Sequence, residues 1–527
     1  MKMKDFSKLN KAFTINRVDI QNFGILTLFI LIIIGMVIYY SDNISNPLLL
    51  GFTAIVGGYM ALNIGANDVA NNVGPAVGSK SLTMAGAITI AVICEISGAL
   101  IAGGEVVNTI RTNIISLKSI EDTKTFITLM LAALISGALW LHFATTIGAP
   151  VSTTHSIVGG VLGAGIVAGG FSVVNWGELS KIILSWVVSP LAGGIIAAIL
   201  LFFMKSTITY KQNKKIAAQK IVPYLIAFMV WAFSLYLINK GLKKVITLDS
   251  LTTLTISFSL AIITFFVVSP IIRNTLEKME NKKEEISKLF TIPLIFAAAL
   301  LSFAHGANDV ANAIGPLAAI NDALRINLET QSSIKTPFWI MLLGGLGISI
   351  GLALFGPKLI KAVGNEITDL DQMRAFCIAM SAALTVLIAS EVGMPVSSTH
   401  IAIGAIFGVG FLREYLKKRY KKMELKILAS YKDKDIEKIK EFLEKFKQSS
   451  VKRKASILKN IDKKKAKQNT QLPEFKKKEL KQLKKAYEEE LVKRSAINKI
   501  VSAWLITVPV SAVIGGILYF LFDVLGF

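Results

Sequence analysis

The heptapeptide Gly65-Ala-Asn-Asp-Val-Ala-Asn71 occurs a second time as Gly306–Asn312, and a Gly-Pro pair follows each copy. Each copy lies where a long apolar run ends, which puts one aspartate, Asp68 or Asp309, at membrane depth. A charged side chain there costs about 2.5–3.5 kcal/mol or more and is kept mainly at functional sites. We therefore predict a duplicated membrane protein whose single polar site is assembled from both copies, with each membrane helix broken at its heptapeptide.

The composition indicates a polytopic membrane protein. The chain has 527 residues, 53% of them hydrophobic, and a mean hydropathy of +0.57. Eleven apolar runs are long enough, or nearly so, to cross about 30 Å of hydrocarbon, and two shorter glycine-rich segments, 151–170 and 396–412, are expected to enter the bilayer as well. The sequence thus predicts an all-α integral membrane protein with about 12–13 membrane segments in two inverted-topology repeats, with broken helices or re-entrant hairpins, and a basic helical cytoplasmic insertion. The eleven runs are 24–40, 48–64, 82–104, 125–147, 182–204, 221–239, 250–272, 289–304, 336–356, 375–390 and 500–521.

A second motif is also duplicated. Pro150-Val-Ser-Thr-Thr-His155 and Pro395-Val-Ser-Ser-Thr-His400 each precede a glycine-rich run, and each half then closes with an apolar segment that runs from a tryptophan to a proline. These landmarks predict transport repeat 1 over 48–204 and transport repeat 2 over 289–412 and 499–525. The remaining parts are a tail with the first membrane helix (1–47), a linker with two spans (205–288) and a basic cytoplasmic insertion (413–498).

The distribution of Lys and Arg predicts the orientation. The N-terminal tail, the loop after repeat 1 and the insertion are basic, and basic segments stay in the cytoplasm. Repeat 1 then starts outside and repeat 2 starts inside. This inverted topology is typical of secondary transporters with a site at the midplane. We expect a multi-pass protein of the cytoplasmic membrane.

The repeated Asn-Asp motif offers oxygen ligands. Carboxylate and amide oxygens, with carbonyls freed at a helix break, suit a small hard cation such as Na⁺, and an aspartate could instead carry a proton. In the alternative interpretation the asparagines only hydrogen-bond helices to one another. Glu95 lies inside an apolar run and either pairs within the bundle or takes part in ion coupling. The candidate coupling-ion residues are Asn67, Asp68, Asn71, Glu95, Asn308, Asp309 and Asn312, with Na⁺ at Asp68 and Asp309.

Three consecutive hydroxyl residues follow the proline of each second motif. Proline suits the first turn of a helix, so these hydroxyls are expected beside unpaired N–H groups, where a tetrahedral oxyanion binds well. The alternative is helix N-capping. The candidate anion-binding residues are Ser152, Thr153, Thr154, Ser397, Ser398 and Thr399. For His155 and His400 we expect hydrogen bonds between helices, with anion contact or proton handling as alternatives.

Other classes of site are not indicated. Cys94 and Cys377 lie in apolar runs of opposite halves and suggest neither a disulfide framework nor a metal cluster. The sequence has no Walker motif and no dinucleotide fingerprint, so we expect neither an ATP-driven pump nor an enzyme, and no cofactor.

The two paired motifs together resemble those of the inorganic phosphate transporter (PiT) family. The resemblance implies secondary uptake of phosphate driven by Na⁺ or H⁺, in some bacterial members as a metal–phosphate complex. It implies that Asp68, Asp309, Asn67 and Asn308 bind the coupling ion and that the hydroxyl clusters bind phosphate. Glu95 matches a glutamate of animal members, whereas Ala379 stands where those members carry a second glutamate.

The basic insertion is the other departure from animal members, whose large cytoplasmic loop lies between the halves. Between Arg413 and Arg494 the chain has 29 Lys or Arg and 13 Asp or Glu, with apolar residues spaced as in amphipathic helices. A segment beside a membrane is expected to contact anionic lipids or to form a solvated helical domain rather than to bind nucleic acid. Alternative functions are sulfate uptake and a phosphate sensor that signals through this segment. The sequence leaves open whether copies of the chain associate.

Overall fold

The computed structural model describes residues 17–115, 120, 122–149, 151–241, 248–325, 335–364, 370–428 and 494–526. These residues are almost entirely helical, and eleven of their helices are long and apolar enough to cross a membrane. Residues Met1–Gly408 and Arg494–Phe527 form one compact unit, and Val409–Lys493 form a second. The predicted all-α membrane fold is confirmed. Most of the predicted basic insertion lies outside the described residues.

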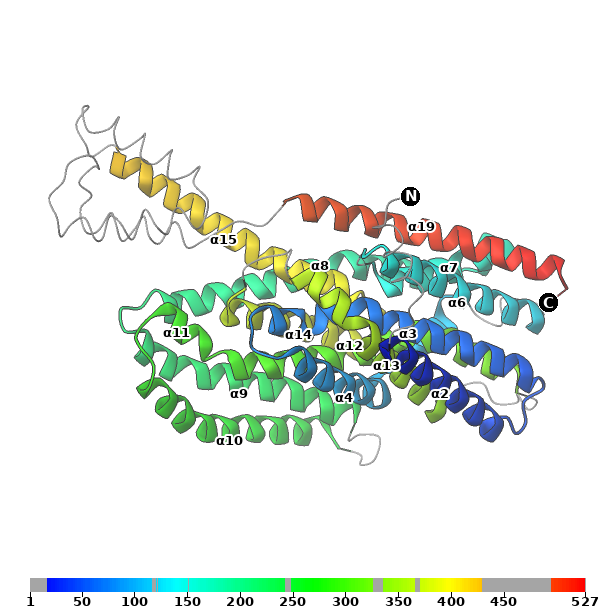
Figure 1. Ribbon diagram of the computed structural model, residues 1–527, viewed down its shortest axis with the longest axis horizontal. Helices are drawn as coiled ribbons and strands as arrows, with labels where there is room; N and C mark the ends of the chain where they lie inside the picture. Colours follow the sequence, from blue (N-terminus) through cyan, green and yellow to red (C-terminus); the bar gives the residue numbers. More distant parts are fainter. Residues whose placement is uncertain are drawn as a thin grey trace, which may run out of the picture. The chain divides into compact units, whose positions relative to one another are not determined.

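Five longer helices follow one another in each half, and Figure 1 labels them along the chain. In the range predicted as repeat 1 they are α3 (Pro47–Gly78), α4 (Met84–Ala102), α6 (Thr123–Thr146), α7 (Thr153–Gly169) and α8 (Trp176–Met204), with the short helices α5 (Gly104–Asn108), η1 (Thr109–Asn113) and η3 (Phe171–Val173) between them. In the range predicted as repeat 2 they are α12 (Thr291–Ala323), α13 (Phe338–Gly364), α14 (Gln372–Glu391), α15 (Ser398–Leu428) and α19 (Arg494–Val524). The other helices are α2 (Arg17–Tyr40), η4 (Lys205–Thr209), α9 (Lys214–Lys240), α10 (Ser250–Glu277) and α11 (Lys283–Lys288).

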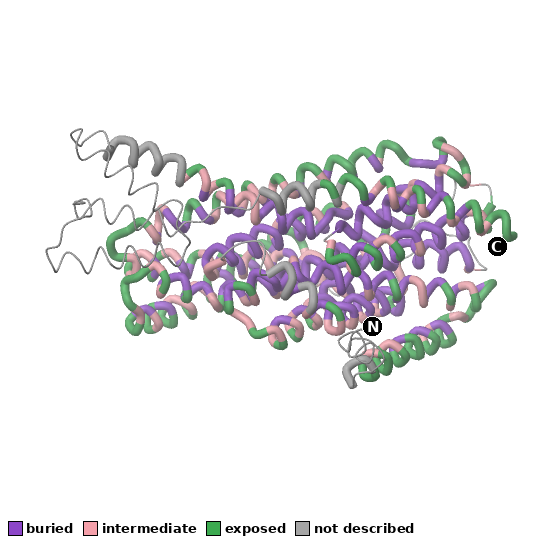
Figure 2. The backbone as a smooth tube through the Cα atoms, turned by 45° about the horizontal axis from the view of Figure 1, so that its top comes forward, coloured by how far each residue is buried: buried purple, intermediate pink, exposed green. Residues whose placement is uncertain are grey.

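Burial separates the helices of the large unit into an inner and an outer group. Figure 2 shows buried backbone along the central helices and exposed backbone along the outer ones. The exposed faces are apolar, with Phe23 on α2, Leu191 on α8 and Phe266 on α10 all more than half exposed. Large exposed apolar faces suit a hydrocarbon solvent. The polar residues discussed below are therefore enclosed by protein, away from the surface that faces lipid.

The expected helix breaks at the heptapeptides are wrong. α3 and α12 are continuous helices of 32 and 33 residues, and each contains its heptapeptide and the following proline. The glycines serve close packing instead: a Cβ on Gly65 would lie 1.9 Å from the carbonyl oxygen of Ile348, and one on Gly306 would lie 2.2 Å from that of Glu95. Small residues let the backbones of membrane helices approach one another.

The chain leaves the helical conformation at the second motif. α6 ends at Thr146 and α7 begins at Thr153, while α14 ends at Glu391 and α15 begins at Ser398. Gly148 and Gly393 adopt φ of +71° and +67° after these helix ends, a conformation that glycine reaches without a steric cost. Non-helical backbone thus lies at the start of each hydroxyl motif and not at the heptapeptides, and the second and third hydroxyl residues of each motif lie in the first turn of the following helix.

The two halves of the chain pack on one another through the helices that follow the hydroxyl motifs. The helix that follows each hydroxyl motif packs on the closing helix of the other repeat, α7 on α19 and α15 on α8, at distances that exclude a Cβ. The closest backbone oxygens to a Cβ at these glycines are Val508 for Gly159, Ala512 for Gly163, Pro190 for Gly404 and Gly194 for Gly408. This interlocking brings both hydroxyl motifs to the centre of the bundle.

Candidate functional site

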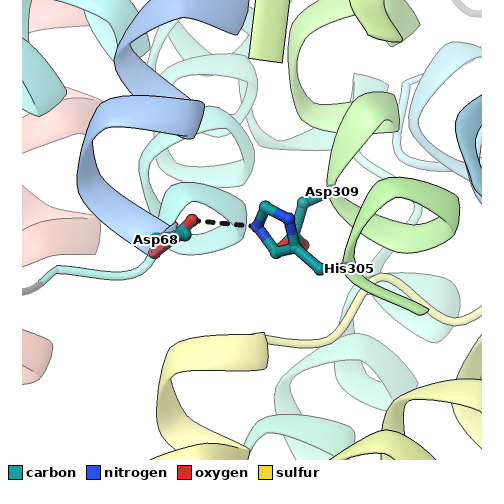
Figure 3. A group of neighbouring side chains, drawn as sticks. All are labelled: Asp68, His305 and Asp309. Carbon is teal, nitrogen blue, oxygen red and sulfur yellow. Dashed lines mark hydrogen bonds and ion pairs between the residues drawn. The ribbon is translucent and has the colours of Figure 1, made fainter. Parts of the chain in front are cut away.

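The two aspartates of the heptapeptides meet at one histidine. Asp68 on α3 and Asp309 on α12 are completely buried, and His305 lies one helical turn before Asp309. The Nε2 atom of His305 is 2.9 Å from Oδ2 of Asp309 and 3.5 Å from Oδ2 of Asp68. Figure 3 shows the imidazole close to both carboxylates, with a dashed line joining it to Asp68. The repeats therefore contribute one carboxylate each to a single polar centre.

Hydroxyl groups of the second motif donate to both carboxylates. Thr399 Oγ1 donates to Asp68 at 2.7 Å, and Ser398 Oγ donates to Asp309 at 2.5 Å. Asn71 donates to the Thr399 hydroxyl oxygen at 2.9 Å, and Asn312 donates to those of Thr153 and Thr154, each at 3.1 Å. Each of these amides contacts the hydroxyl motif of the other repeat. Asp68, Asn71, Asp309 and Asn312 thus share hydrogen bonds with the hydroxyl residues Thr153, Thr154, Ser398 and Thr399.

The first hydroxyl of each cluster caps a helix. Ser152 accepts from the backbone N–H of His155 at 3.1 Å, and Ser397 accepts from that of His400 at 3.2 Å. Thr154 donates to the carbonyl of Val396 at 2.9 Å and so ties the start of α7 to the non-helical segment before α15. N-capping, the alternative interpretation of the clusters, therefore holds for Ser152 and Ser397. The hydroxyls that follow them face side chains of the polar centre or the non-helical segment of the other half.

Asn67 and Asn308 brace the non-helical segments. Asn67 donates to the Thr145 hydroxyl at 3.0 Å and to the carbonyl of Ala149 at 3.4 Å. Asn308 donates to the Ser390 hydroxyl and to the carbonyl of Met394, both at 3.0 Å, and accepts from the N–H of Val396 at 3.2 Å. The amide nitrogens of Asn67 and Asn308 therefore hold the non-helical segments in place. Asn67 Oδ1 is buried without a hydrogen-bond partner among the described residues.

Glu95 lies against the other side of His305. Its carboxylate oxygens are 2.7 and 2.8 Å from Nδ1 of His305, and Asn72 donates to it at 2.8 Å. Sequence reasoning predicted Glu95 but missed Asn72 and His305 as members of the site. Position was the available signal, because both residues directly flank a heptapeptide copy, at its end and at its start.

This second polar cluster occurs at only one of two corresponding helix contacts. Gly98 on α4 packs against the Phe303 carbonyl of α12 just as Gly351 on α13 packs against the Leu62 carbonyl of α3, so Glu95 corresponds to Ile348. The repeated sequences align His305 with Ile64 and Asn72 with Ala313. Ala379 is buried in α14 and is not the counterpart of Glu95 in this packing. The counterparts Ile64, Ala313 and Ile348 are apolar and completely buried.

The hydrogen bonding expected of His155 is wrong. Both of its buried ring nitrogens lack a hydrogen-bond partner among the described residues. The ring instead lies 3.9 Å from that of Trp186 and edge-on to that of His400, at 4.4 Å between centroids. The three rings come from α7, α8 and α15, and aromatic packing replaces the hydrogen bonds that we predicted for His155.

Comparison with known proteins places the sequence in a family. Residues 64–515 match the model of the phosphate transporter family. The chain belongs to this family. It is 52% identical over 523 residues to a protein of Helicobacter pylori strain J99 named "Putative phosphate permease", covering 98% of this chain and 97% of that one. A protein of Pyrococcus furiosus named "Putative phosphate permease PF1020" is 40% identical over 374 residues, covering 70% of this chain and 89% of that one.

A solved structure is similar as well. The structure titled "The sodium-dependent phosphate transporter" has a TM-score of 0.72 and 30% sequence identity, and the match covers 90% of this chain and 99% of that one. The resemblance to the phosphate transporter family is thus confirmed, and the chain is a multi-pass membrane protein of that family.

Proposed function

We propose that the protein carries inorganic phosphate across the cytoplasmic membrane together with a small cation, Na⁺ or H⁺, by alternating access of two inverted repeats. The observation that supports this most strongly is the direct bonding of buried carboxylates to the predicted phosphate donors, Thr399 to Asp68 at 2.7 Å and Ser398 to Asp309 at 2.5 Å. Because the residues for the cation and those for phosphate share these hydrogen bonds, binding of one ligand cannot be independent of binding of the other.

The shared hydrogen bonds supply a coupling mechanism. A hydroxyl has one hydrogen to donate, so Thr399 and Ser398 can donate either to a carboxylate or to a phosphate oxygen. A cation bound to Asp68 and Asp309 replaces the lost donors and frees both hydroxyls for phosphate. By thermodynamic reciprocity, phosphate then strengthens cation binding by the same factor.

Charge also favours joint binding. Two buried carboxylates repel an incoming phosphate dianion in a medium of low dielectric constant, and a bound cation reduces that repulsion. Amide oxygens of Asn67, Asn71, Asn308 and Asn312 supply further hard ligands for Na⁺. The name of the similar solved structure, a sodium-dependent transporter, favours Na⁺ over H⁺.

The carboxylates also favour phosphate over sulfate. Phosphate at neutral pH retains a hydrogen to donate, whereas sulfate has none, so a carboxylate acceptor discriminates between the two anions. Asp68 and Asp309 directly contact the hydroxyl donors, while Glu95 faces His305 and Asn72. We assign the acceptor role to the two aspartates.

The test is uptake of radiolabelled phosphate into proteoliposomes that contain only this protein. We expect accumulation driven by an inward Na⁺ or H⁺ gradient, none without a gradient, and little competition from excess sulfate. Saturable phosphate binding without accumulation under any gradient would overturn the transport proposal and favour a sensor. Equal competition by sulfate would overturn the assigned selectivity.

A further inference from the structure

The non-helical segments before α7 and α15 differ in how they are covered. Gly148 and Gly393 correspond to each other, because each lies two residues before the proline of its hydroxyl motif. Gly148 is exposed, and no atom of the described residues would lie within 4 Å of a Cβ there. Gly393 is buried, and a Cβ there would lie 3.5 Å from the carbonyl oxygen of Glu105 and from Oγ1 of Thr109. α5 and η1 therefore cover the second segment.

Lys240, the last residue of α9, ties the same segment to α5. Its Nζ donates to the carbonyl oxygen of Glu391, the last residue of α14, at 3.1 Å. Nζ also lies 3.6 Å from Oε2 of Glu391 and 3.9 Å from Oε1 of Glu105. The Lys240 side chain is only 13% exposed, and lysine is rarely buried to this extent without partners. One ammonium group thus joins two carboxylates that would otherwise repel each other.

Thr109 on η1 completes this contact. Its hydroxyl donates to the carbonyl oxygen of Gly393 at 2.7 Å, and the bond is buried. η1 is a π-helical turn, and such turns are frequent at functional sites. Lys240 belongs to the linker predicted over 205–288 and to neither repeat, so the duplication does not account for the contact.

We propose that Lys240 is a latch that holds residues 391–393, the tip between α14 and α15, in place and so closes one side of the polar centre. This inference rests on the proposed transport function. The other end of α9 follows the basic loop that is predicted to be cytoplasmic, so the latch faces the outside. Phosphate and its cation then enter from outside only after Lys240 releases Glu391.

The tip is bonded to residues of the polar centre, so its release would reach them. Asn308 donates to the Ser390 hydroxyl and to the carbonyl of Met394, both at 3.0 Å, and these two residues flank the tip. The second hydroxyl motif follows on the same segment and donates to both buried aspartates. Closure of the latch thus completes the site around its ligands, as a lid does in other proteins.

The first test locates the tip by pulsed electron paramagnetic resonance on the full chain in lipid nanodiscs without phosphate. Spin labels are attached at Val392→Cys on the tip and at Leu251→Cys on α10, which packs against α9, after both native cysteines are changed to alanine. Both labelled positions are exposed. We expect a single distance population with Lys240 present and a second population in Lys240→Gln.

The matched control is Lys181→Gln. It breaks an exposed ion pair with Glu178 inside one helix, α8, and should leave the distance distribution unchanged. Glu391→Gln removes the other charge of the latch but keeps the bond to the carbonyl, so it should give the same second population to a smaller extent.

The second test is phosphate uptake into right-side-out vesicles. Lys240→Gln should lower the external phosphate concentration for half-maximal uptake by about fivefold, because a larger fraction of the protein is then open to the outside. A lysine that only stabilises the fold would instead reduce the amount of folded protein and leave that concentration unchanged. Lys181→Gln should not alter it.

The two tests together decide the proposal. An unchanged distance distribution in Lys240→Gln, or a second population without any change in the concentration for half-maximal uptake, would overturn it. If Lys240→Gln does not fold, the same two measurements on Glu391→Gln decide. If the unmodified protein accumulates no phosphate, the proposed function fails, and the distance measurement by itself decides whether the latch exists.

Discussion

The contact between α4 and α12 and the contact between α13 and α3 share their backbone packing but differ in chemistry. Gly98 and Gly306 close the first, and Gly351 and Gly65 close the second, each against a backbone carbonyl. At the first, Glu95 and His305 form one hydrogen-bonded cluster with Asn72 of α3, and alanine and isoleucine stand at the three corresponding positions of the other half. Duplication thus accounts for the backbone packing that the two contacts share, whereas the polar side chains occur at one contact only.

The shared part of the site should respond equally in both repeats. We expect Asp68→Asn and Asp309→Asn each to abolish cation-driven phosphate accumulation while the protein remains in the membrane, because each removes a buried charge that binds the cation. The measurement is proteoliposome uptake per folded protein. Asp249→Asn is the control, since it changes an exposed N-cap of α10 to another good cap. Near-normal accumulation by either site variant would refute the cation assignment.

The glycine packing should also be equally important at both contacts. A methyl group on Gly65 or Gly306 would overlap a carbonyl oxygen at 1.9 or 2.2 Å. We therefore expect Gly65→Ala and Gly306→Ala to reduce the yield of monodisperse folded protein severely and to a similar extent. Gly35→Ala on α2, where nothing lies within 4 Å of the added carbon, should be neutral or stabilise α2 by up to about 1 kcal/mol. A mild effect at only one of the tight glycines would break the structural equivalence.

The chemical difference between the contacts gives a third prediction. Ile348→Glu places at the apolar contact the residue that the polar contact has, but without a histidine or an asparagine to pair with it. We expect an unpaired buried charge to lower the free energy of unfolding by about 3–5 kcal/mol. Ile348→Leu conserves volume and should cost less than about 1.5 kcal/mol. Thermal unfolding in detergent compares the two, and equal stability would mean that both contacts accept a polar group.

The hydroxyl donors should show a smaller, graded effect. Removing one donor to a desolvated anion costs about 1.5–3 kcal/mol, which corresponds to a rise of roughly 10–100-fold in the phosphate concentration for half-maximal uptake. We expect this for Thr399→Val and Ser398→Ala. Thr89→Val on α4, whose hydroxyl only bonds to the carbonyl of Ala85, is the control. If the phosphate concentration for half-maximal uptake is unchanged in the Thr399→Val/Ser398→Ala double variant, these hydroxyls have a structural role and do not bind phosphate.

The sequence predicted most of the fold because hydrophobic run length is a strong signal in membranes. It placed Asp68, Asp309 and the hydroxyl clusters in one site because a duplicated charged motif in apolar surroundings has few structural explanations. It misplaced the helix breaks, since glycine beside alanine was taken as a point of flexibility, whereas Gly65 and Gly306 serve close backbone contact.

The cluster around His305 could not be predicted from repeated motifs. His305 and Glu95 are separated by 210 positions, and neither they nor Asn72 have a polar counterpart in the other repeat. Only the packing of α4 on α12 brings them together. The repeated motifs therefore predicted the residues that both halves share, but not the cluster around His305, which occurs in one half only.

The central claim is that phosphate and the coupling cation share the hydrogen bonds of Thr399 and Ser398. Equilibrium binding to purified protein tests it most directly, with phosphate affinity measured across Na⁺ concentrations and pH values, and cation affinity measured across phosphate concentrations. The account predicts that each ligand strengthens the other by the same factor. It also predicts that this factor falls towards one in the Thr399→Val/Ser398→Ala double variant. Phosphate affinity that is independent of both Na⁺ and pH, or coupling that is undiminished in the double variant, would contradict it.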